Sequence, residues 1–232
     1  MVLKACAISK QFLRKGKGTN IFTAVNETDF ELQEGQLAVL TGRSGSGKST
    51  FLNMLSGVLE PTGGRVLVGE KDLYQLDDKE RSELRNQFFG YIPQGQSAIM
   101  SLNVLENVLL PYTLYGELTG TKEQSAEAYA RELLERMGIA DLAEAMPNEL
   151  SGGEMRRMAI ARALIRRPAV VFADEPTGDL DDENTKVVFE LLRSIARDGA
   201  AVLLVTHENE AKRYADCLYR MSGGVLEEET GK

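Results

Sequence analysis

Short apolar runs and longer stripes of helical period alternate along this chain and predict an α/β fold. Apolar runs that end at glycine, proline or polar residues are typical of buried strands. The predicted strands cover residues 2–8, 21–32, 36–40, 65–68, 88–94, 169–175, 201–207, 217–221 and 224–228. Apolar positions that recur every three to four residues predict helices. These helices cover residues 48–57, 77–87, 101–116, 123–138, 152–167 and 183–199.

The alternation stops in the middle of the chain, where only helical spacing remains. Residues 96–160 are therefore predicted to form a helical subdomain inserted into an α/β core made of residues 1–95 and 161–232. The strands of the N-terminal region are expected to add an antiparallel β piece to this core. The whole chain is predicted to be one domain.

Composition narrows the classes of function. The chain has 232 residues and a net charge of −8, from 27 basic and 35 acidic side chains. A chain of this charge lacks the basic surface of a nucleic-acid-binding protein. Its two cysteines, Cys6 and Cys217, follow no metal-binding spacing and are expected to be free thiols. We find no signal peptide and no apolar run of membrane-spanning length, so we expect no membrane crossing.

The sequence GRSGSGKST at residues 42–50 matches the phosphate-binding P-loop pattern. Glycines let successive backbone N–H groups converge on an anion, and the helix that follows offers its N-terminus to the same phosphates. The alternative is a plain flexible turn, but the match lies between a predicted strand and a predicted helix, as the motif requires. The expected nucleotide contacts are Gly42, Ser44, Gly45, Gly47, Lys48, Ser49 and Thr50.

Two acidic residues follow the apolar run VVFA. Asp174 and Glu175 are expected at the carboxyl end of a buried strand, where open α/β sheets bind ligands. Asp174 suits the Mg²⁺ shell together with Ser49. Glu175 is then placed to polarise an attacking water as a general base. The alternative is a solvated acidic loop, but the P-loop upstream favours the Mg²⁺ and general-base roles.

The sequence LSGGE at residues 150–154 predicts a helix start, with Ser151 as the N-cap and Glu154 closing a capping box. Gly152 and Gly153 also leave that helix N-terminus bare enough to face an anion. The chain has only one P-loop, so the simplest anion is a nucleotide phosphate held by another copy or a homologue.

Together, these motifs resemble those of the ABC ATPases, the nucleotide-binding subunits of ABC transporters, in order and spacing. The resemblance covers nearly the whole chain and implies ATP and Mg²⁺ as cofactors. It makes Gln94 the glutamine that senses Mg²⁺ and contacts the membrane subunit, and it makes His207 the histidine that contacts the γ-phosphate. It also implies that Phe12 stacks on adenine and that Asp179 lies near the P-loop of the opposite protomer.

A narrower resemblance is carried by ADEPTGDLD (173–181), SGSGKST, LENVLLPYTLYGE (105–117) and LSGGE. These segments are similar to the macrolide-efflux, lipoprotein-releasing and FtsE-like branch, the MacB/LolD type. The resemblance implies a dimer of ATPase subunits, bound to a separate membrane subunit on the cytoplasmic face of the membrane. One other function remains open: an FtsE-like ATPase that signals through its membrane partner without transport. A non-transport ABC ATPase acting on DNA repair or ribosomes is disfavoured, because such proteins usually add coiled-coil arms, zinc modules or a second cassette, and the acidic charge argues against a nucleic-acid surface.

Overall fold

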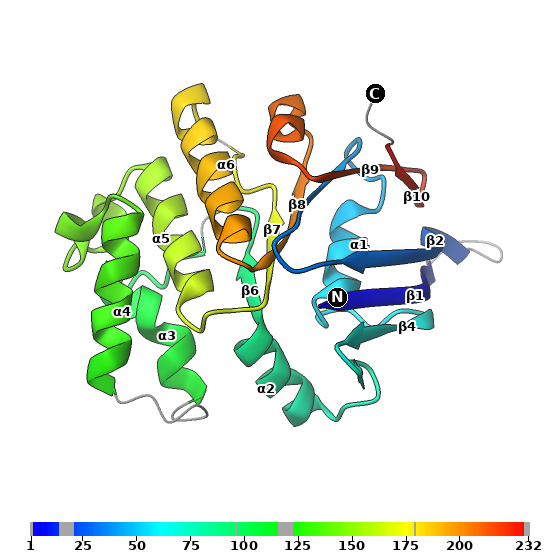
Figure 1. Ribbon diagram of the computed structural model, residues 1–232, viewed down its shortest axis with the longest axis horizontal. Helices are drawn as coiled ribbons and strands as arrows, with labels where there is room; N and C mark the ends of the chain where they lie inside the picture. The colour runs from blue at the N-terminus through cyan, green and yellow to red at the C-terminus, as the bar shows by residue number, and fades with distance from the viewer. Residues whose placement is uncertain (1, 14–20, 96, 116–122, 179, 230–232) are drawn as a thin grey trace.

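The computed structural model describes residues 2–13, 21–95, 97–115, 123–178 and 180–229, and its core is a six-stranded, mostly parallel sheet. The strand order is β10-β9-β3-β8-β7-β6, in which only β10 runs antiparallel to its neighbour. The strands are β3 (Leu37–Thr41), β6 (Phe89–Ile92), β7 (Val170–Asp174), β8 (Ala201–Thr206), β9 (Cys217–Ser222) and β10 (Val225–Glu228). The predicted buried strands are thus joined in one sheet (Figure 1).

A second, four-stranded antiparallel sheet has the order β2-β1-β4-β5. It consists of β1 (Leu3–Leu13), β2 (Ile21–Leu32), β4 (Gly63–Val68) and the two-residue β5 (Lys71–Asp72). This sheet is the predicted antiparallel piece, although β1 is longer than predicted and the short β5 was not predicted. The first helix, α1 (Lys48–Leu55), lies beside it and contacts β1 and β2 (Figure 1).

The central sheet is covered on both faces, and its side chains alternate between two hydrophobic clusters. Within β7, Val170 and Phe172 belong to the cluster shared with α1 and the antiparallel sheet. Val171 and Ala173 belong to the cluster shared with α6 (Asp182–Arg197) and the helical region. This alternation follows from the two-residue period of a strand. Burial on both faces explains why the strand is continuously apolar.

The helical region contains α3 (Val104–Tyr115), α4 (Glu123–Arg136), α5 (Gly152–Leu164) and the 3₁₀ turns η1 (Ala140–Leu142) and η2 (Pro147–Glu149). The described residues between 97 and 160 include no strand. The predicted boundary between residues 160 and 161 falls inside the continuous helix α5, so the exact division of the chain stays a prediction.

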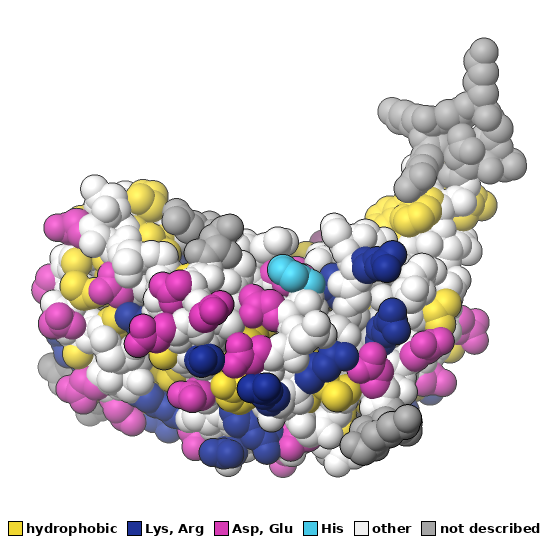
Figure 2. Space-filling view, turned by 90° about the horizontal axis from the view of Figure 1, so that it is seen from above, with side chains coloured by type: hydrophobic (Ala, Val, Ile, Leu, Met, Phe, Trp, Pro, Cys, Tyr) yellow, Lys and Arg dark blue, Asp and Glu magenta, His cyan; other side chains and the backbone are white. Residues whose placement is uncertain are grey.

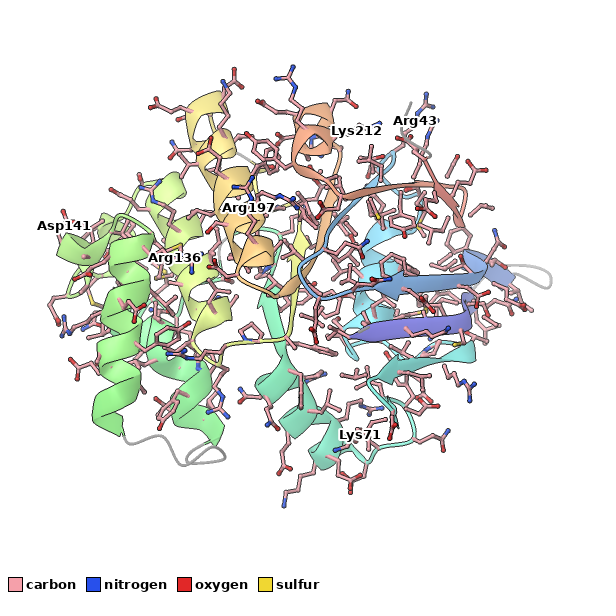
Figure 3. All side chains as sticks on the ribbon, in the orientation of Figure 1. Arg43, Lys71, Arg136, Asp141, Arg197 and Lys212 are labelled. Atoms are coloured by element: carbon pink, nitrogen blue, oxygen red, sulfur yellow. The ribbon has the colours of Figure 1, made fainter. Side chains whose placement is uncertain are left out.

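Ion pairs and hydrogen bonds join this helical region to the core. Arg136, near the end of α4, bonds to Ser194 and Asp198 at the end of α6 (Figure 3 labels Arg136). Arg156 of α5 donates to the backbone carbonyl of Pro93, which directly follows β6, at 2.8 Å. The remaining helices are α2 (Asp78–Phe88), which begins with a capping box of Asp77 and Glu80, and the 3₁₀ helix η3 (Asn209–Tyr214).

Candidate nucleotide-binding site

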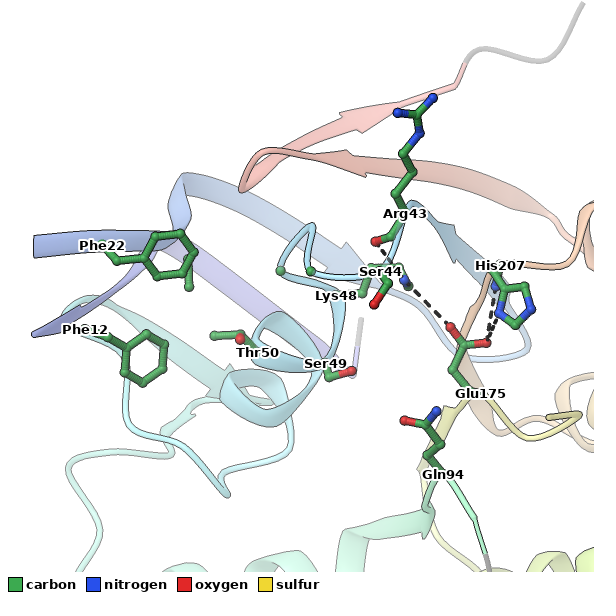
Figure 4. A pocket seen from close by; sticks show the side chains of 13 residues that line it. Phe12, Phe22, Arg43, Ser44, Lys48, Ser49, Thr50, Gln94, Glu175 and His207 are labelled. Carbon is green, nitrogen blue, oxygen red and sulfur yellow. Dashed lines mark hydrogen bonds and ion pairs between the residues drawn. The ribbon is translucent and has the colours of Figure 1, made fainter. Parts of the chain in front are cut away.

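A pocket of about 820 Å³ opens where the two sheets meet, at the carboxyl ends of the parallel strands. Most of the predicted nucleotide contacts line it, together with three residues that were not predicted (Figure 4). The lining residues are Phe12, Phe22, Ala24, Arg43, Ser44, Gly45, Gly47, Lys48, Ser49, Thr50, Gln94, Glu175 and His207. In the view from above, acidic and basic side chains are interspersed over the face that carries the single histidine (Figure 2).

The loop before α1 needs its glycines. Gly47, the N-cap of α1, has a φ of 110°, and because it has no side chain it makes no capping hydrogen bond. A Cβ on Gly47 would lie 2.4 Å from the Ala24 backbone oxygen, a distance that no side chain tolerates. The first turn of α1 also carries no acidic residue. The positive end of the helix dipole is therefore left for a ligand, as phosphate binding requires.

Lys48 is buried, and its ammonium group lies within the P-loop. The Nζ atom donates to the backbone oxygens of Gly42 at 2.9 Å and Arg43 at 3.3 Å. It also lies 3.7 Å from Glu175 Oε1. A buried ammonium needs such partners because burial without them is costly. A phosphate that enters the pocket can replace the carboxylate as the partner of this charge.

Glu175 is the residue that connects the pocket's charged groups. Its Oε2 atom lies 2.8 Å from His207 Nδ1 and accepts a hydrogen bond from the His207 backbone N–H at 3.3 Å. The carboxylate thus lies between Lys48 and His207, although they come from α1 and from the end of β8. Glu175 has a φ of 45°, a strained conformation for a residue with a side chain, and such strain is concentrated at functional sites.

Asp174 and Ser49 form a second polar pair beneath the loop. The Ser49 hydroxyl donates to Asp174 Oδ1 at 3.3 Å. Burial raises the pKa of Asp174, because desolvation disfavours the carboxylate; the Ser49 hydrogen bond opposes this shift and the charge of Glu175 adds to it. Together with the Gln94 amide in the pocket, this pair supplies the hard oxygen ligands that Mg²⁺ prefers. A divalent cation here would favour the charged form of Asp174.

The predicted second anion site lies elsewhere. Ser151, Gly152 and Gly153 do not line the pocket, and Ser151 is exposed. Ser151 caps α5 as predicted: Glu154 accepts from the Ser151 backbone N–H and from the hydroxyl, each at 2.7 Å. The prediction for Asp179 lies outside the described residues.

Three residues of the pocket were not predicted: Phe22, Ala24 and Arg43. Phe22 and Ala24 belong to β2, and Phe22 is paired with Phe12 across the β1–β2 hairpin. Pattern alone predicts a strand there but not which residue of β1 faces it, because pairing register is a tertiary property. Phe12 also lies beyond the predicted strand 2–8, so no signal in the sequence indicated its pairing with Phe22.

Comparison with known proteins identifies the class. The family model described as "ABC transporter" matches residues 25–178, so this chain belongs to the ABC transporter family. This confirms the resemblance predicted from the motifs. Within the described residues, no helix is both long and apolar enough to cross a membrane.

Individual relatives agree with this assignment. The lipoprotein-releasing system ATP-binding protein LolD of Hydrogenovibrio crunogenus is 39% identical over 99% of this chain and 98% of its own length. The ABC transporter ATP-binding protein YtrE of Bacillus subtilis is 36% identical over 92% of this chain and 90% of its own. The solved dimer of the ATP-binding cassette MJ0796, in a post-hydrolysis state with ADP and Pi, has a TM-score of 0.87 at 31% identity and covers 99% of this chain and 100% of that one. The predicted fold class is thereby confirmed.

Proposed function

We propose that this chain is the ATP-hydrolysing subunit of a lipoprotein-releasing type of transporter, and that it drives a separate membrane subunit. The observation that carries the hydrolytic function is the cluster of Lys48, Glu175 and His207 next to the open N-terminus of α1. The transported class rests on the names of relatives such as LolD, which match nearly the full chain.

The cluster suits phosphoryl transfer to water. The P-loop N–H groups and Lys48 hold the phosphates, and Lys48 exchanges its contact with Glu175 for a contact with phosphate oxygens. Glu175 Oε1, released from that contact, accepts a proton from the attacking water. His207 stays against Oε2 and orients the carboxylate while its exposed ring reaches toward the terminal phosphate. Ser49, Asp174 and Gln94 would hold Mg²⁺, which supplies positive charge to the phosphates.

The role of Glu175 is tested by Glu175→Gln. Loss of a positioned general base lowers turnover by roughly 10²–10⁴-fold, whereas the amide keeps the shape needed to bind MgATP. The measurements are the steady-state ATPase rate and equilibrium binding of MgATP. The matched control is Glu70→Gln, which changes an exposed glutamate outside the pocket. ATP hydrolysis by Glu175→Gln at the rate of that control would remove Glu175 from this role.

The working unit is proposed to be a dimer of ATPase subunits, in which Ser151, Gly152 and Gly153 of one subunit face the phosphates held by the other. Two observations support this. The related cassette MJ0796 is dimeric in its solved structure with ADP and Pi, and Ser151 lies on an exposed helix start outside this chain's own pocket. Asp179 is proposed to contact the opposite P-loop.

The membrane subunit is proposed to bind near Gln94, with this chain on the cytoplasmic face of the membrane. Ile99 and Met100 follow Gln94 on the segment that leads into α3, and they are 40% and 56% exposed. Because they are neighbours in the chain, they can form a small apolar patch for a partner protein to cover. The test is co-purification with the membrane subunit encoded for the same transporter. The double variant Ile99→Glu and Met100→Glu should lose the membrane subunit and keep its basal ATPase rate.

The control for that experiment is Val58→Glu, because Val58 is a similarly exposed apolar residue, at 61%, which lies just after α1. Its copurification should match that of the unmodified chain. Equal recovery of the membrane subunit with all three proteins would contradict the proposed contact surface.

A further inference from the structure

We propose that Phe22 is a second base-stacking residue, so that two aromatic rings of the β1–β2 hairpin, and not Phe12 alone, bind the base of the nucleotide. The inference deepens the proposed function and rests on the nucleotide site described above. It assigns Phe22 a part in selecting the substrate class: nucleoside triphosphates with a purine base.

The pairing of β1 with β2 brings the two rings to one place. Phe12 and Phe22 are directly opposite each other in this antiparallel pair. Opposite residues in an antiparallel pair present their side chains on the same face of the sheet. Both rings accordingly line the pocket, at the end away from Glu175 and His207 and beyond Thr50 (Figure 4). A nucleotide with its phosphates at Lys48 would direct its base toward this end.

Phe22 is more exposed than the core aromatic residue of the same strand, Phe30. Phe30, also in β2, is 4% exposed and packs edge-on against Phe51 at 5.4 Å between ring centroids. Phe22 and Phe12 are each 38% exposed. Covering exposed ring surface inside a pocket with a flat ligand is favourable, because it removes apolar area from water. The exposure of the pair is thus that of a ligand platform and not of a core contact.

One face of the Phe12 ring already has a partner. The Lys10 ammonium lies over this ring, 5.4 Å from its centroid, and donates to the Glu60 backbone oxygen. That cation–π contact leaves one face of Phe12 for a base. Phe22 adds a second ring next to it, which widens the surface that the base covers. A purine has more ring area than a pyrimidine and gains more from the wider surface.

The chain contains no tryptophan, which gives a direct readout. In Phe22→Trp the new indole is the only one, and a base that stacks on it should change its fluorescence. MgATP should produce this change, and MgCTP a smaller one. Tripolyphosphate with Mg²⁺ should compete for the P-loop but produce no change by itself. Phe12→Trp is the positive control, and Leu13→Trp is the negative control because Leu13 is 87% exposed and does not line the pocket.

Kinetics provide a second, independent test. Stacking of one base on one aromatic ring is lost on truncation, so Phe22→Ala should raise the KM for ATP by roughly 5- to 150-fold with kcat nearly unchanged. Phe22→Leu, apolar but without a ring, should behave like Phe22→Ala, whereas Phe22→Tyr should retain the affinity. The ratio of the KM values for CTP and ATP should fall toward one in Phe22→Ala. The inhibition constant of tripolyphosphate should be the same in all four proteins.

The outcomes separate this inference from the proposed function. A response to MgATP in Phe12→Trp but none in Phe22→Trp, with an unchanged KM in Phe22→Ala, would overturn the role of Phe22 and leave the nucleotide site intact. Equal weakening of ATP and tripolyphosphate by Phe22→Ala would show a structural role only and also overturn it. Failure of the unmodified chain to bind either MgATP or tripolyphosphate would overturn the nucleotide site itself.

Discussion

Two helices of this chain begin at glycine-rich turns, and their N-termini are built in opposite ways. The N-cap of α1 is Gly47, which has no side chain to accept from the first turn, and that turn has no acidic residue. The N-cap of α5 is Ser151, and its side chain and that of Glu154 close a reciprocal capping box. Both helix starts were predicted to face phosphates; α1 borders the pocket, and for α5, which carries a capping box, this stays a prediction.

The difference shows that a helix N-terminus can bind an anion without competition, or only after the anion displaces a carboxylate of the same chain. At α1 no side chain caps the first turn and no acidic residue lies in it, so a phosphate has no carboxylate of that turn to displace. At α5 the carboxylate of Glu154 already uses this potential, and hydrogen bonds from the Ser151 hydroxyl and backbone hold the pKa of Glu154 below its ordinary value. A phosphate there has to compete with that carboxylate for the Ser151 hydroxyl.

We infer that the order of events follows from this contrast. ATP binds first to the open site at α1 of one subunit. The α5 start of the second subunit joins only when the terminal phosphate is offered close enough to replace Glu154 as the partner of Ser151. The contact between subunits would therefore depend on the phosphate, as a switch requires.

The largest expected effect is at the open site. Lys48→Ala removes the one buried cationic side chain among the P-loop residues 42–50, and this side chain lines the pocket. Loss of one preorganised electrostatic group costs roughly 10²–10³-fold in rate, so ATP hydrolysis should fall by about this factor. The matched control is Lys71→Ala, an exposed lysine in β5 (labelled in Figure 3). Equal ATPase rates for the two variants would contradict the assignment of α1 as the main phosphate site.

The next effect tests whether α5 acts on the opposite subunit. Ser151→Arg should be nearly inactive alone, because the side chain fills the space proposed for the partner's phosphate. When Ser151→Arg and Lys48→Ala subunits are mixed, a heterodimer has one site with both lesions and one with neither. Partial ATPase activity should therefore return on mixing. If hydrolysis by Ser151→Arg alone matches that of the unmodified chain with the membrane subunit present, the shared site is wrong.

A smaller effect should come from removing the competing charge at α5. Glu154→Gln keeps a capping side chain but no negative charge. A charge at a helix N-terminus is worth roughly 0.3–1 kcal/mol, so the MgATP-dependent dimer should become about two- to fivefold tighter. Sedimentation in the Glu175→Gln background measures this without hydrolysis. Glu149→Gln, in the short turn η2 that precedes α5, is the control, and equal dimer affinity in both variants would contradict the competition.

The smallest effect concerns stability at low pH. The folded pKa of Glu154 lies below its unfolded value, so its cap stabilises the protein above roughly pH 4.3, the ordinary glutamate pKa, and the stabilisation is lost as pH falls through the folded pKa. The free energy of unfolding in urea should differ between the unmodified chain and Glu154→Gln at pH 7, by less than about 1 kcal/mol. This difference should shrink below pH 4, and a constant difference would contradict the assignment.

The helices and strands could be predicted because each carries a local signal. The apolar run before Asp174 predicts β7, and the pairs Asp77 with Glu80 and Ser151 with Glu154 predict helix starts that the structure shows with both capping hydrogen bonds. Capping and periodicity act over a few residues, so they are present in the sequence itself. The short strand β5 and the three 3₁₀ turns carry too few residues for such a signal.

The candidate site divides in the same way. The P-loop was predicted as a unit because its glycines and Lys48 are adjacent in sequence. The contact of Ser49 with Asp174 joins residues 125 positions apart, and that of Glu175 with His207 joins residues 32 apart. The contact of Glu175 with His207 was not predicted, whereas the Mg²⁺ chemistry of a P-loop suggested the first pair beforehand. The place of Phe22 had no such help, and the strand register alone revealed it.

The two kinds of helix start are local features of the chain, since glycine at one N-cap and serine with a glutamate three residues later at the other set the capping contacts of α1 and α5. Which charges meet in the pocket depends instead on how distant segments pack together. The strands β3, β8 and β7 are neighbours and run parallel, so the P-loop, His207 and Glu175, which follow them in the chain, lie together at their carboxyl ends. Pairings between strands far apart in the chain depend on packing of the whole core, and no local pattern encodes them.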